Sequence, residues 1–309
     1  EMAIMAVPLA GWIAMESIDD RKLLMSRLTV FGVPVAIGVS LWMIYNFARF
    51  GHPFDTGLLR DPNVQFDTPV LVGLHGLLAS PGRAWFLYCP VVAGGVAALW
   101  LLARRDRSTA MLFGSQVFLL LMLISRMHQW DGGESYGPRY LIPVLPFVTI
   151  PLATCFSLNR FSRMRRLLPV LLVVSVLVQL PGVLVDYSKT QNAFAGQTEN
   201  YSIEMSRYTW SGAPLKLNAE AALIAIPRNL AYVTGRMAIP QVSRTGEESQ
   251  RDFSQQFSFS LDFWWLYLYY LGVMPAGWAV GLGLAPLAVA GWLSLLLLRR
   301  LYVYEGVTV

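Results

Sequence analysis

The hydrophobic residues of this chain gather in long blocks instead of alternating with polar residues. Seven apolar runs lie at about 2–16, 28–48, 84–103, 110–126, 140–158, 167–185 and 273–298. A helix needs roughly 20 apolar residues to cross a bilayer core of about 30 Å, and most of these runs approach or exceed that length. The run at 167–180 has none of the alternation that strands of a membrane barrel need. The pattern therefore predicts an all-α polytopic membrane protein with about seven transmembrane helices.

The composition supports the same class of protein. The 309 residues are 55% hydrophobic and 14% charged, whereas soluble domains carry about 25% charged residues. These values exclude a soluble enzyme, a nucleic-acid-binding domain and a disulfide-stapled secreted module. The two cysteines, Cys89 and Cys155, lie in apolar runs whose predicted topology places them near opposite membrane faces. We expect free thiols, because a disulfide needs Cα atoms within about 7 Å.

The net charge of +5 is explained by membrane topology and not by a nucleic-acid partner. Half of the 24 Lys and Arg residues fall in the short connections. They are Arg21, Lys22, Arg27, Arg104, Arg105, Arg107, Arg160, Arg163, Arg165, Arg166, Arg299 and Arg300. These connections alternate with longer ones at 49–83, 126–139 and 186–262. The positive-inside rule assigns the short basic loops to the cytoplasm, so we expect the three long connections on the outer face.

Three regions follow from this topology. Residues 1–185 are predicted to form a bundle of about six spans. Residues 186–262 face water outside, either as a small extracytoplasmic subdomain or as long interfacial loops, with a short helix expected over 217–230. Residues 263–309 comprise an aromatic segment (263–270), the last span and a cytoplasmic tail. We expect the aromatic segment at the outer interface, because Trp and Tyr prefer the membrane–water boundary.

The connection 126–139 is the densest in functional groups and is the first candidate site. Its candidate binding residues are Trp130, Asp131, Glu134, Tyr136 and Arg139. Arg139 follows a proline at the predicted start of a span, and an arginine beside free helix N–H groups suits a phosphate. Aromatic rings beside carboxylates suit a sugar. The alternative interpretation is an interfacial loop whose arginine and tyrosines only reach the lipid headgroups.

The connection 49–83 and its flanks form the second candidate. Arg83 follows Ser-Pro-Gly at the start of a predicted span, as Arg139 follows Gly-Pro. The helix dipole disfavours a cation at that end, so two such arginines indicate an anion, either a substrate phosphate or the phosphates of membrane lipids. His75 lies in an apolar stretch, 70–79, that is too short to cross and is expected along the outer interface. His75 is a candidate ligand contact, or simply an interfacial residue.

At these residues the chain resembles the C-terminal half of a bacterial polytopic glycosyltransferase of the GT-C class, similar to family 39 protein mannosyltransferases and to aminoarabinose transferases. The resemblance rests on YNFARFG at 45–51, SPGR at 80–83, WDGG at 130–133 and YGPRYL at 136–141. It covers about residues 30–160, and beyond 186 only the aromatic entry to the last span resembles the family.

The resemblance implies an enzyme of the bacterial cytoplasmic (inner) membrane. Its donor would be a polyprenyl-phosphate-linked sugar, with Arg83 and Arg139 beside the leaving phosphate, in some members together with a divalent metal. The family's catalytic acid lies in its first outer loop, and no acidic residue here matches it by motif. We therefore expect that residue upstream of residue 1. The alternative is a non-catalytic membrane subunit, whose degenerate transferase scaffold packs against partner subunits.

Overall fold

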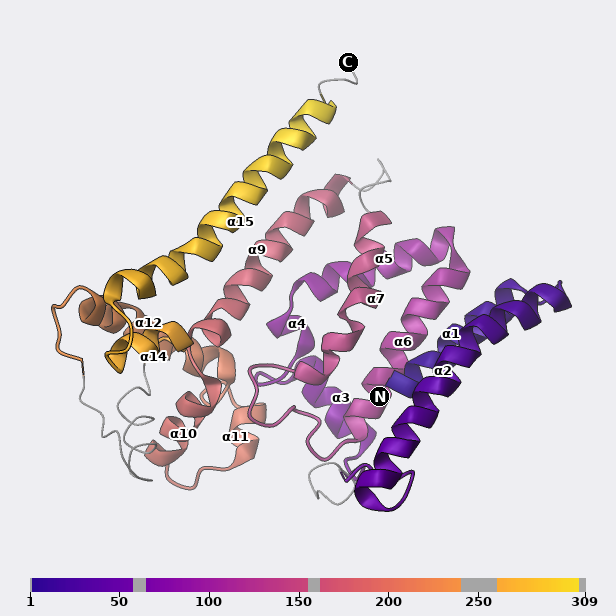
Figure 1. The fold of residues 1–309 in the computed structure, drawn as a ribbon, viewed down its shortest axis with the longest axis horizontal. Coiled ribbons are helices and arrows are strands. Elements are labelled where there is room, and N and C mark those ends of the chain that lie inside the picture. The colour runs from indigo at the N-terminus through magenta and orange to yellow at the C-terminus, as the bar shows by residue number, and fades with distance from the viewer. Residues whose placement is uncertain (1, 58–64, 155–161, 240–259, 306–309) are drawn as a thin grey trace. The chain divides into compact units, whose positions relative to one another are not determined.

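Every regular element is a helix in the computed structural model, which describes residues 2–57, 65–154, 162–239 and 260–305 (Figure 1). The elements are α1 (Met2–Glu16), α2 (Arg21–Phe50), α3 (Val70–Ala79), α4 (Trp85–Tyr88), α5 (Val91–Arg105), α6 (Arg107–Arg126), the 3₁₀ helix η3 (Arg139–Val144), α7 (Leu145–Thr149), the 3₁₀ helix η4 (Ile150–Leu152), α9 (Ser162–Leu184), α10 (Tyr187–Gln197), α11 (Ile203–Tyr208), α12 (Pro214–Val233), α14 (Trp264–Tyr270) and α15 (Ala276–Glu305). The predicted all-α class is confirmed for these residues, as is a helix over 217–230, which lies within α12.

Within the described residues, four helices are long and apolar enough to cross a membrane. They are α2, α6, the part of α9 from Arg166 to Leu184, and the part of α15 from Ala276 to Leu296. The other three predicted spans fall on shorter pieces: α1, the pair α4 and α5, and the series η3–α7–η4. Prolines account for the two broken runs, because Pro90 lies between α4 and α5 and prolines recur through 143–151. Seven crossings therefore remain a prediction.

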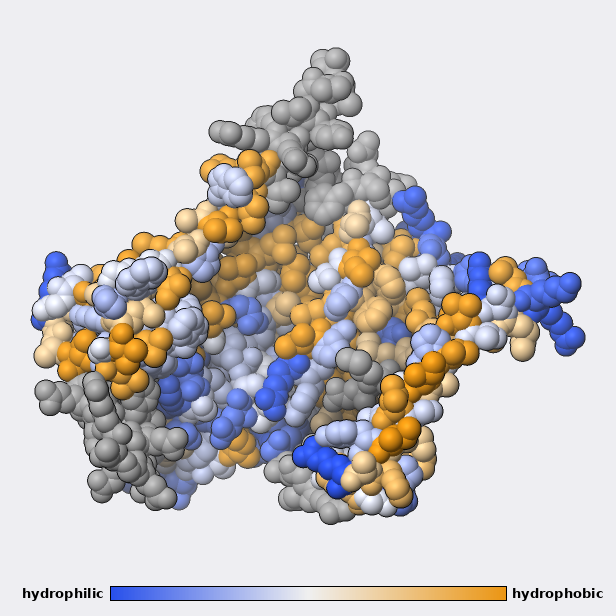
Figure 2. Space-filling model, in the orientation of Figure 1, coloured by the Kyte–Doolittle hydropathy of each residue, from blue (hydrophilic) through white to orange (hydrophobic). Residues whose placement is uncertain are grey.

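The exposed surface of α2 fits a lipid environment. Val30 is 72% exposed, Leu41 62% and Ile44 64%, and Figure 2 shows apolar side chains along this helix. In water such a surface would exceed the few hundred Å² of apolar patch usual for soluble monomers, whereas a bilayer solvates it. Exposure of large apolar side chains on α2 is thus what a lipid-facing helix requires.

The contacts divide the chain into two compact units. The first comprises residues 1–182 and 191–218, and the second comprises 183–190 and 219–309. The predicted boundaries at 185 and 262 rest on membrane topology and stay a prediction. Cys89, in the first unit, is a half-buried free thiol, as expected. Cys155 lies outside the described residues.

Helix α6 is the centre of the first unit, where α1, α3, α5 and the η3–α7 series all pack against it. Its buried side chains Leu120 and Ile124 join Leu77 of α3 and Val148 of α7 in one hydrophobic cluster. A glycine brings α3 close: a Cβ built on Gly73 would lie 2.1 Å from the backbone oxygen of Ser125. Small residues at such crossings let membrane helices approach closely.

The two ends of α6 differ in chemistry. At its first residue, a tight turn capped by Asp106 joins it to α5 and carries Arg104, Arg105 and Arg107. At its last residue, about 30 Å away for 20 helical residues, the chain enters the 126–139 connection. Residues 65–68 run beside that end: the Thr68 N–H donates to the Arg126 carbonyl and the His128 N–H to the Gln65 carbonyl. The basic turn and the candidate site therefore lie at opposite ends of one helix.

Polar side chains of α9 satisfy the backbone where the helix breaks at Pro90. The Ser175 hydroxyl accepts a hydrogen bond from the Val91 N–H at 2.9 Å. The Gln179 amide donates to the Tyr88 carbonyl. Unpaired backbone groups are costly in an apolar environment, so such side chains make the break tolerable.

The second unit has its own small clusters. Tyr232 of α12 packs with Leu266 and Tyr270 of α14 and with Ala279 of α15. Lys189 is held by an ion pair to Asp262 (3.4 Å) and a hydrogen bond to the Tyr267 hydroxyl (3.0 Å). The aromatic segment predicted at 263–270 is thus largely the helix α14, which leads into α15.

The approach of α3 to α6 gives a first prediction. Gly73→Ala should lower the free energy of unfolding by about 1–3 kcal/mol, because backbone atoms of Ser125 block the added methyl group. The matched control is Gly38→Ala on α2, where nothing lies within 4 Å. That change should be neutral or stabilise by up to about 1 kcal/mol, since alanine is the better helix former. Denaturant titration in micelles measures both, and equal stabilities would contradict the packing described.

Candidate functional site

The site is built on the connection between α6 and η3, whose backbone turns on glycines. Gly132, Gly133 and Gly137 have φ values of +83°, +61° and +78°, which residues with a Cβ rarely adopt. The Asp131 carboxylate accepts a hydrogen bond from the Gly133 N–H at 3.3 Å. This turn directs Trp130 and Asp131 inward, where they are 2% and 0% exposed. The glycines therefore give this connection a backbone that other residues rarely adopt.

Asp131 is a buried carboxylate with two guanidinium neighbours. Its Oδ2 accepts a hydrogen bond from Nε of Arg207 at 3.0 Å. The Nη2 of Arg83 lies 4.0 Å from the same oxygen. Burying a charge is tolerable only where it is paired and hydrogen-bonded, and these contacts supply that pairing.

The position of Arg83 differs from expectation. We expected an outward-facing cation at the start of a span. Arg83 instead lies in the turn between α3 and α4 and is 0% exposed, with its guanidinium donating to the carbonyls of Gly82 (3.1 Å) and Gly133 (3.0 Å). The buried Asp131 is a stronger attraction than solvent-exposed phosphate, because charges interact more strongly away from water. Arg83 therefore holds the glycine turn through its hydrogen bond to Gly133. It lines neither of the two cavities described below.

Arg207 of α11 is a member of the site that the sequence did not reveal. Its Nη1 contacts Glu204 at 2.9 Å, and its guanidinium lies 5.4 Å from the centre of the Trp130 indole. Burial lowers the pKa of Arg207, but the hydrogen bond and charge of Asp131, followed by those of Glu204, outweigh it and leave the pKa raised. Arg207 therefore stays charged and joins α11 to the connection.

A polar cavity of about 510 Å³ opens on one side of Arg207. It is lined by Gln129, Asp131, Gly133, Glu134, Arg139, Gln191, Asn192, Ala195, Tyr201, Ile203 and Arg207. The side chains of Glu134 and Arg139 are exposed here, and the Arg139 guanidinium lies 5.2 Å from the centre of the Tyr140 ring. Three of the predicted site residues, Asp131, Glu134 and Arg139, are thus brought together. Arg139 is the first residue of a helix, as predicted, although that helix is 3₁₀.

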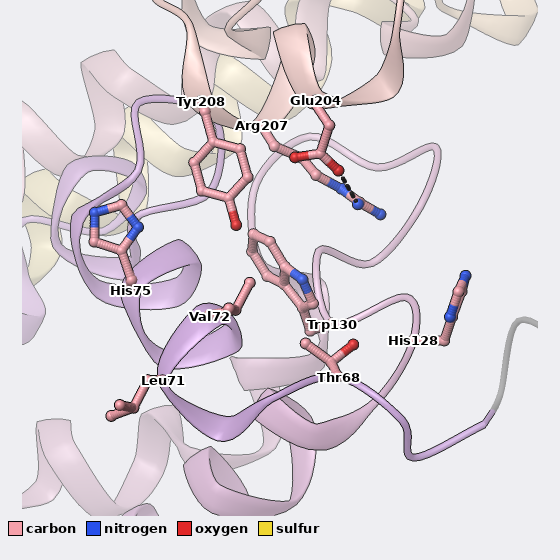
Figure 3. A pocket seen from close by; sticks show the side chains of 9 residues that line it. All are labelled: Thr68, Leu71, Val72, His75, His128, Trp130, Glu204, Arg207 and Tyr208. Carbon is pink, nitrogen blue, oxygen red and sulfur yellow. Dashed lines mark hydrogen bonds and ion pairs between the residues drawn. The ribbon is translucent and has the colours of Figure 1, made fainter.

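An aromatic cavity of about 550 Å³ opens on the other side of Arg207 (Figure 3). It is lined by Thr68, Leu71, Val72, His75, His128, Trp130, Glu204, Arg207 and Tyr208. The His75 ring stacks on Tyr208 with centroids 5.9 Å apart, and Tyr208 is tilted against Trp130 at 6.1 Å. His75 and Trp130 therefore belong to this cavity and not to the polar one.

Tyr136 lines neither cavity. Its hydroxyl donates to the Val178 carbonyl, and its ring packs edge-on against Tyr88 and fills the space beside Gly182. Burial, then the neighbouring Tyr88, raises the pKa of Tyr136. Its geometry is that of a packing residue that attaches the connection to α9, whereas we had predicted a substrate contact.

Sequence reasoning missed a group of lining residues on α10, α11 and the segment between them, besides Thr68, His128 and others near α3 and the 126–139 connection. The group includes Gln191, Asn192, Tyr201, Glu204, Arg207 and Tyr208. The one local signal was the spacing of Glu204 and Arg207, three residues apart on a helix face. No group of three or more His, Cys, Asp or Glu side chains that could hold a metal ion occurs among the residues that the structure describes.

Comparison with known proteins adds no assignment. No family model, curated protein or solved structure matches the chain.

The buried carboxylate gives a second prediction. Asp131→Asn should lower the free energy of unfolding by about 3 kcal/mol, because it removes the buried carboxylate that pairs with the guanidinium groups of Arg83 and Arg207. Glu134→Gln, an exposed change three residues later, is the control and should alter stability by less than about 0.5 kcal/mol. Thermal unfolding followed by circular dichroism compares the two variants. Asp131→Asn as stable as Glu134→Gln would contradict the structural role of the pair.

Proposed function

We propose that the chain forms the sugar-phosphate site of a membrane glycosyltransferase, which takes a sugar from a polyprenyl-phosphate donor at the outer face. The observation that carries the proposal is the polar cavity, in which exposed Arg139 and Glu134 adjoin the Asp131–Arg207 pair. The family resemblance of the 130–141 segment, stated above, independently suggests the same chemistry.

The lining suits the two parts of such a head group. Arg139 is exposed and lacks a carboxylate partner among the described contacts, so its guanidinium is the natural partner for a phosphate, which it binds through paired hydrogen bonds. Glu134, Gln191 and Asn192 offer acceptors and donors to sugar hydroxyls. Arg207 forms ion pairs with the carboxylates of Asp131 and Glu204. Its charge is therefore balanced, and its main role is to hold the wall of the polar cavity in place.

Arg83 takes a different role from the one that the resemblance implied. It does not line the polar cavity, and its contacts with Gly133 and Asp131 hold the loop that carries Glu134. We therefore assign the phosphate contact to Arg139 alone and make Arg83 a positioning residue. The carboxylate that would accept the acceptor's proton is not assigned.

The location of the cavity agrees with the predicted topology. It lies at the end of α6 remote from the Arg104–Arg107 turn, which the positive-inside rule assigns to the cytoplasm. A polar head carried on the outer leaflet would meet the cavity from that side. The bacterial inner membrane and seven crossings are parts of this proposal.

A binding experiment tests the phosphate role. In phosphatidylcholine nanodiscs, Arg139→Ala should weaken the affinity for undecaprenyl phosphate by about tenfold, because a charge-assisted hydrogen bond contributes roughly 1.5–3 kcal/mol. Arg49→Ala, which removes another exposed arginine in the last turn of α2, should leave the affinity unchanged. Undecaprenol, which lacks the phosphate, should bind both proteins equally.

Two outcomes would contradict the proposal. Equal affinity of Arg139→Ala and the unchanged protein would remove Arg139 from the phosphate role. No binding of undecaprenyl phosphate beyond that of undecaprenol would favour the alternative, a non-catalytic membrane subunit that packs against partner helices.

Topology is tested separately with reporters. An alkaline phosphatase fusion near Gly196 should be active, because α10 is predicted outside, and a fusion at Asp106 should be inactive. The reverse pattern would invert the orientation and place the polar cavity on the cytoplasmic side.

A further inference from the structure

The aromatic cavity has a wall of stacked rings. The rings of Tyr208 and His75 lie nearly parallel, at an interplanar angle of 19°. The Trp130 ring packs against Tyr208 at an interplanar angle of 50°. His75 is exposed and Tyr208 is half-buried, so part of this ring surface faces the open cavity in Figure 3. Aromatic faces of this kind bind flat, partly apolar ligand surfaces.

The part of the rim next to His75 on α3 is apolar. Leu71 and Val72 of α3 are 79% and 45% exposed, although they border a cavity that also contains Glu204 and Arg207. Exposed leucine and valine beside charged groups form an amphipathic opening, with one side suited to a hydrocarbon chain and the other to a polar head.

The charges that border the cavity balance one another. Among the lining residues, Arg207 contacts Glu204 at 2.9 Å, and His128 contacts Asp67 at 3.0 Å. The lining arginine therefore faces a lining carboxylate, and the cavity offers hydrogen bonds in place of net charge. Glu204, whose side chain is 56% exposed, can still accept a hydrogen bond from a hydroxyl group.

We propose that this cavity binds an amphiphile whose head is an uncharged, hydroxyl-bearing ring. The ring lies against Tyr208 and His75, a hydroxyl donates to Glu204, and the chain leaves over Leu71 and Val72. The volume of about 550 Å³ is within the range of small-molecule sites. The site is separate from the polar cavity, with which it shares Arg207 alone among the lining residues.

A photoreactive alkyl glycoside tests the proposal. The probe has a glucose head, a dodecyl chain and a diazirine near the head, and it is added to the chain in phosphatidylcholine nanodiscs. Mass spectrometry should find adducts concentrated on peptides from α3 and α11. A probe with the same chain and a phosphocholine head should not show that preference, and this comparison needs no variant.

Variants sharpen the test. Tyr208→Ala should reduce labelling of α3 by roughly fivefold through the lost ring contact, whereas Tyr208→Phe should keep most of it. Glu204→Gln should reduce labelling by roughly tenfold through the lost charge-assisted hydrogen bond. Glu199→Gln, an exposed change outside the lining, serves as control.

Equal labelling by the two head groups, or adducts spread over α2 as much as α3, would overturn the proposal. Loss of labelling in Tyr208→Phe equal to that in Tyr208→Ala would also overturn it, because the ring would then not be the contact. None of these outcomes involves a polyprenyl phosphate, so they are distinguishable from failure of the function proposed for the polar cavity.

Discussion

The burial of Asp131 between two guanidinium groups is the interaction on which the rest of the site depends. Its partners come from separate parts of the chain: Arg83 from the turn after α3, and Arg207 from α11. A buried carboxylate that lost its partners would destabilise the fold by several kcal/mol. The requirement to pair this charge therefore fixes three segments against one another, and the two cavities form on either side of the junction.

The helices around Asp131 pack closely, and several of them are short or broken. Gly73 allows α3 to touch the backbone of α6, and Gly95 allows α5 to approach Val148 of α7. Ser175 of α9 satisfies the N–H group exposed where Pro90 breaks a helix. Such breaks are tolerated at membrane depth only where side chains satisfy the freed backbone groups. Prolines thus coincide with the breaks at Pro90 and within 143–151, whereas the long helices α2, α9 and α15 continue through internal prolines.

Features set by residues close together in the sequence could be predicted, whereas contacts between residues far apart in the sequence could not. Apolar runs are local, and they correctly indicated helices, several of them long and apolar, in the part of the chain that the structure describes. The grouping of Glu134 with Arg139 was also local. The partner of Asp131 could not be predicted, because Arg207 is 76 residues away and lies in a stretch without a recognisable motif. Arg83 was misplaced for the same reason: its local setting indicated an exposed cation, whereas a distant carboxylate decides its position.

Arg207 connects the two proposed sites physically. It donates to Asp131 beside the polar cavity and to Glu204 beside the aromatic one, and its guanidinium covers the Trp130 ring between them. Because the phosphate contact is assigned to Arg139, Arg207 keeps both carboxylates and forms a shared wall of the two cavities. Substitution of Arg207 would therefore disturb the walls of both cavities, because one guanidinium holds Asp131 and Glu204.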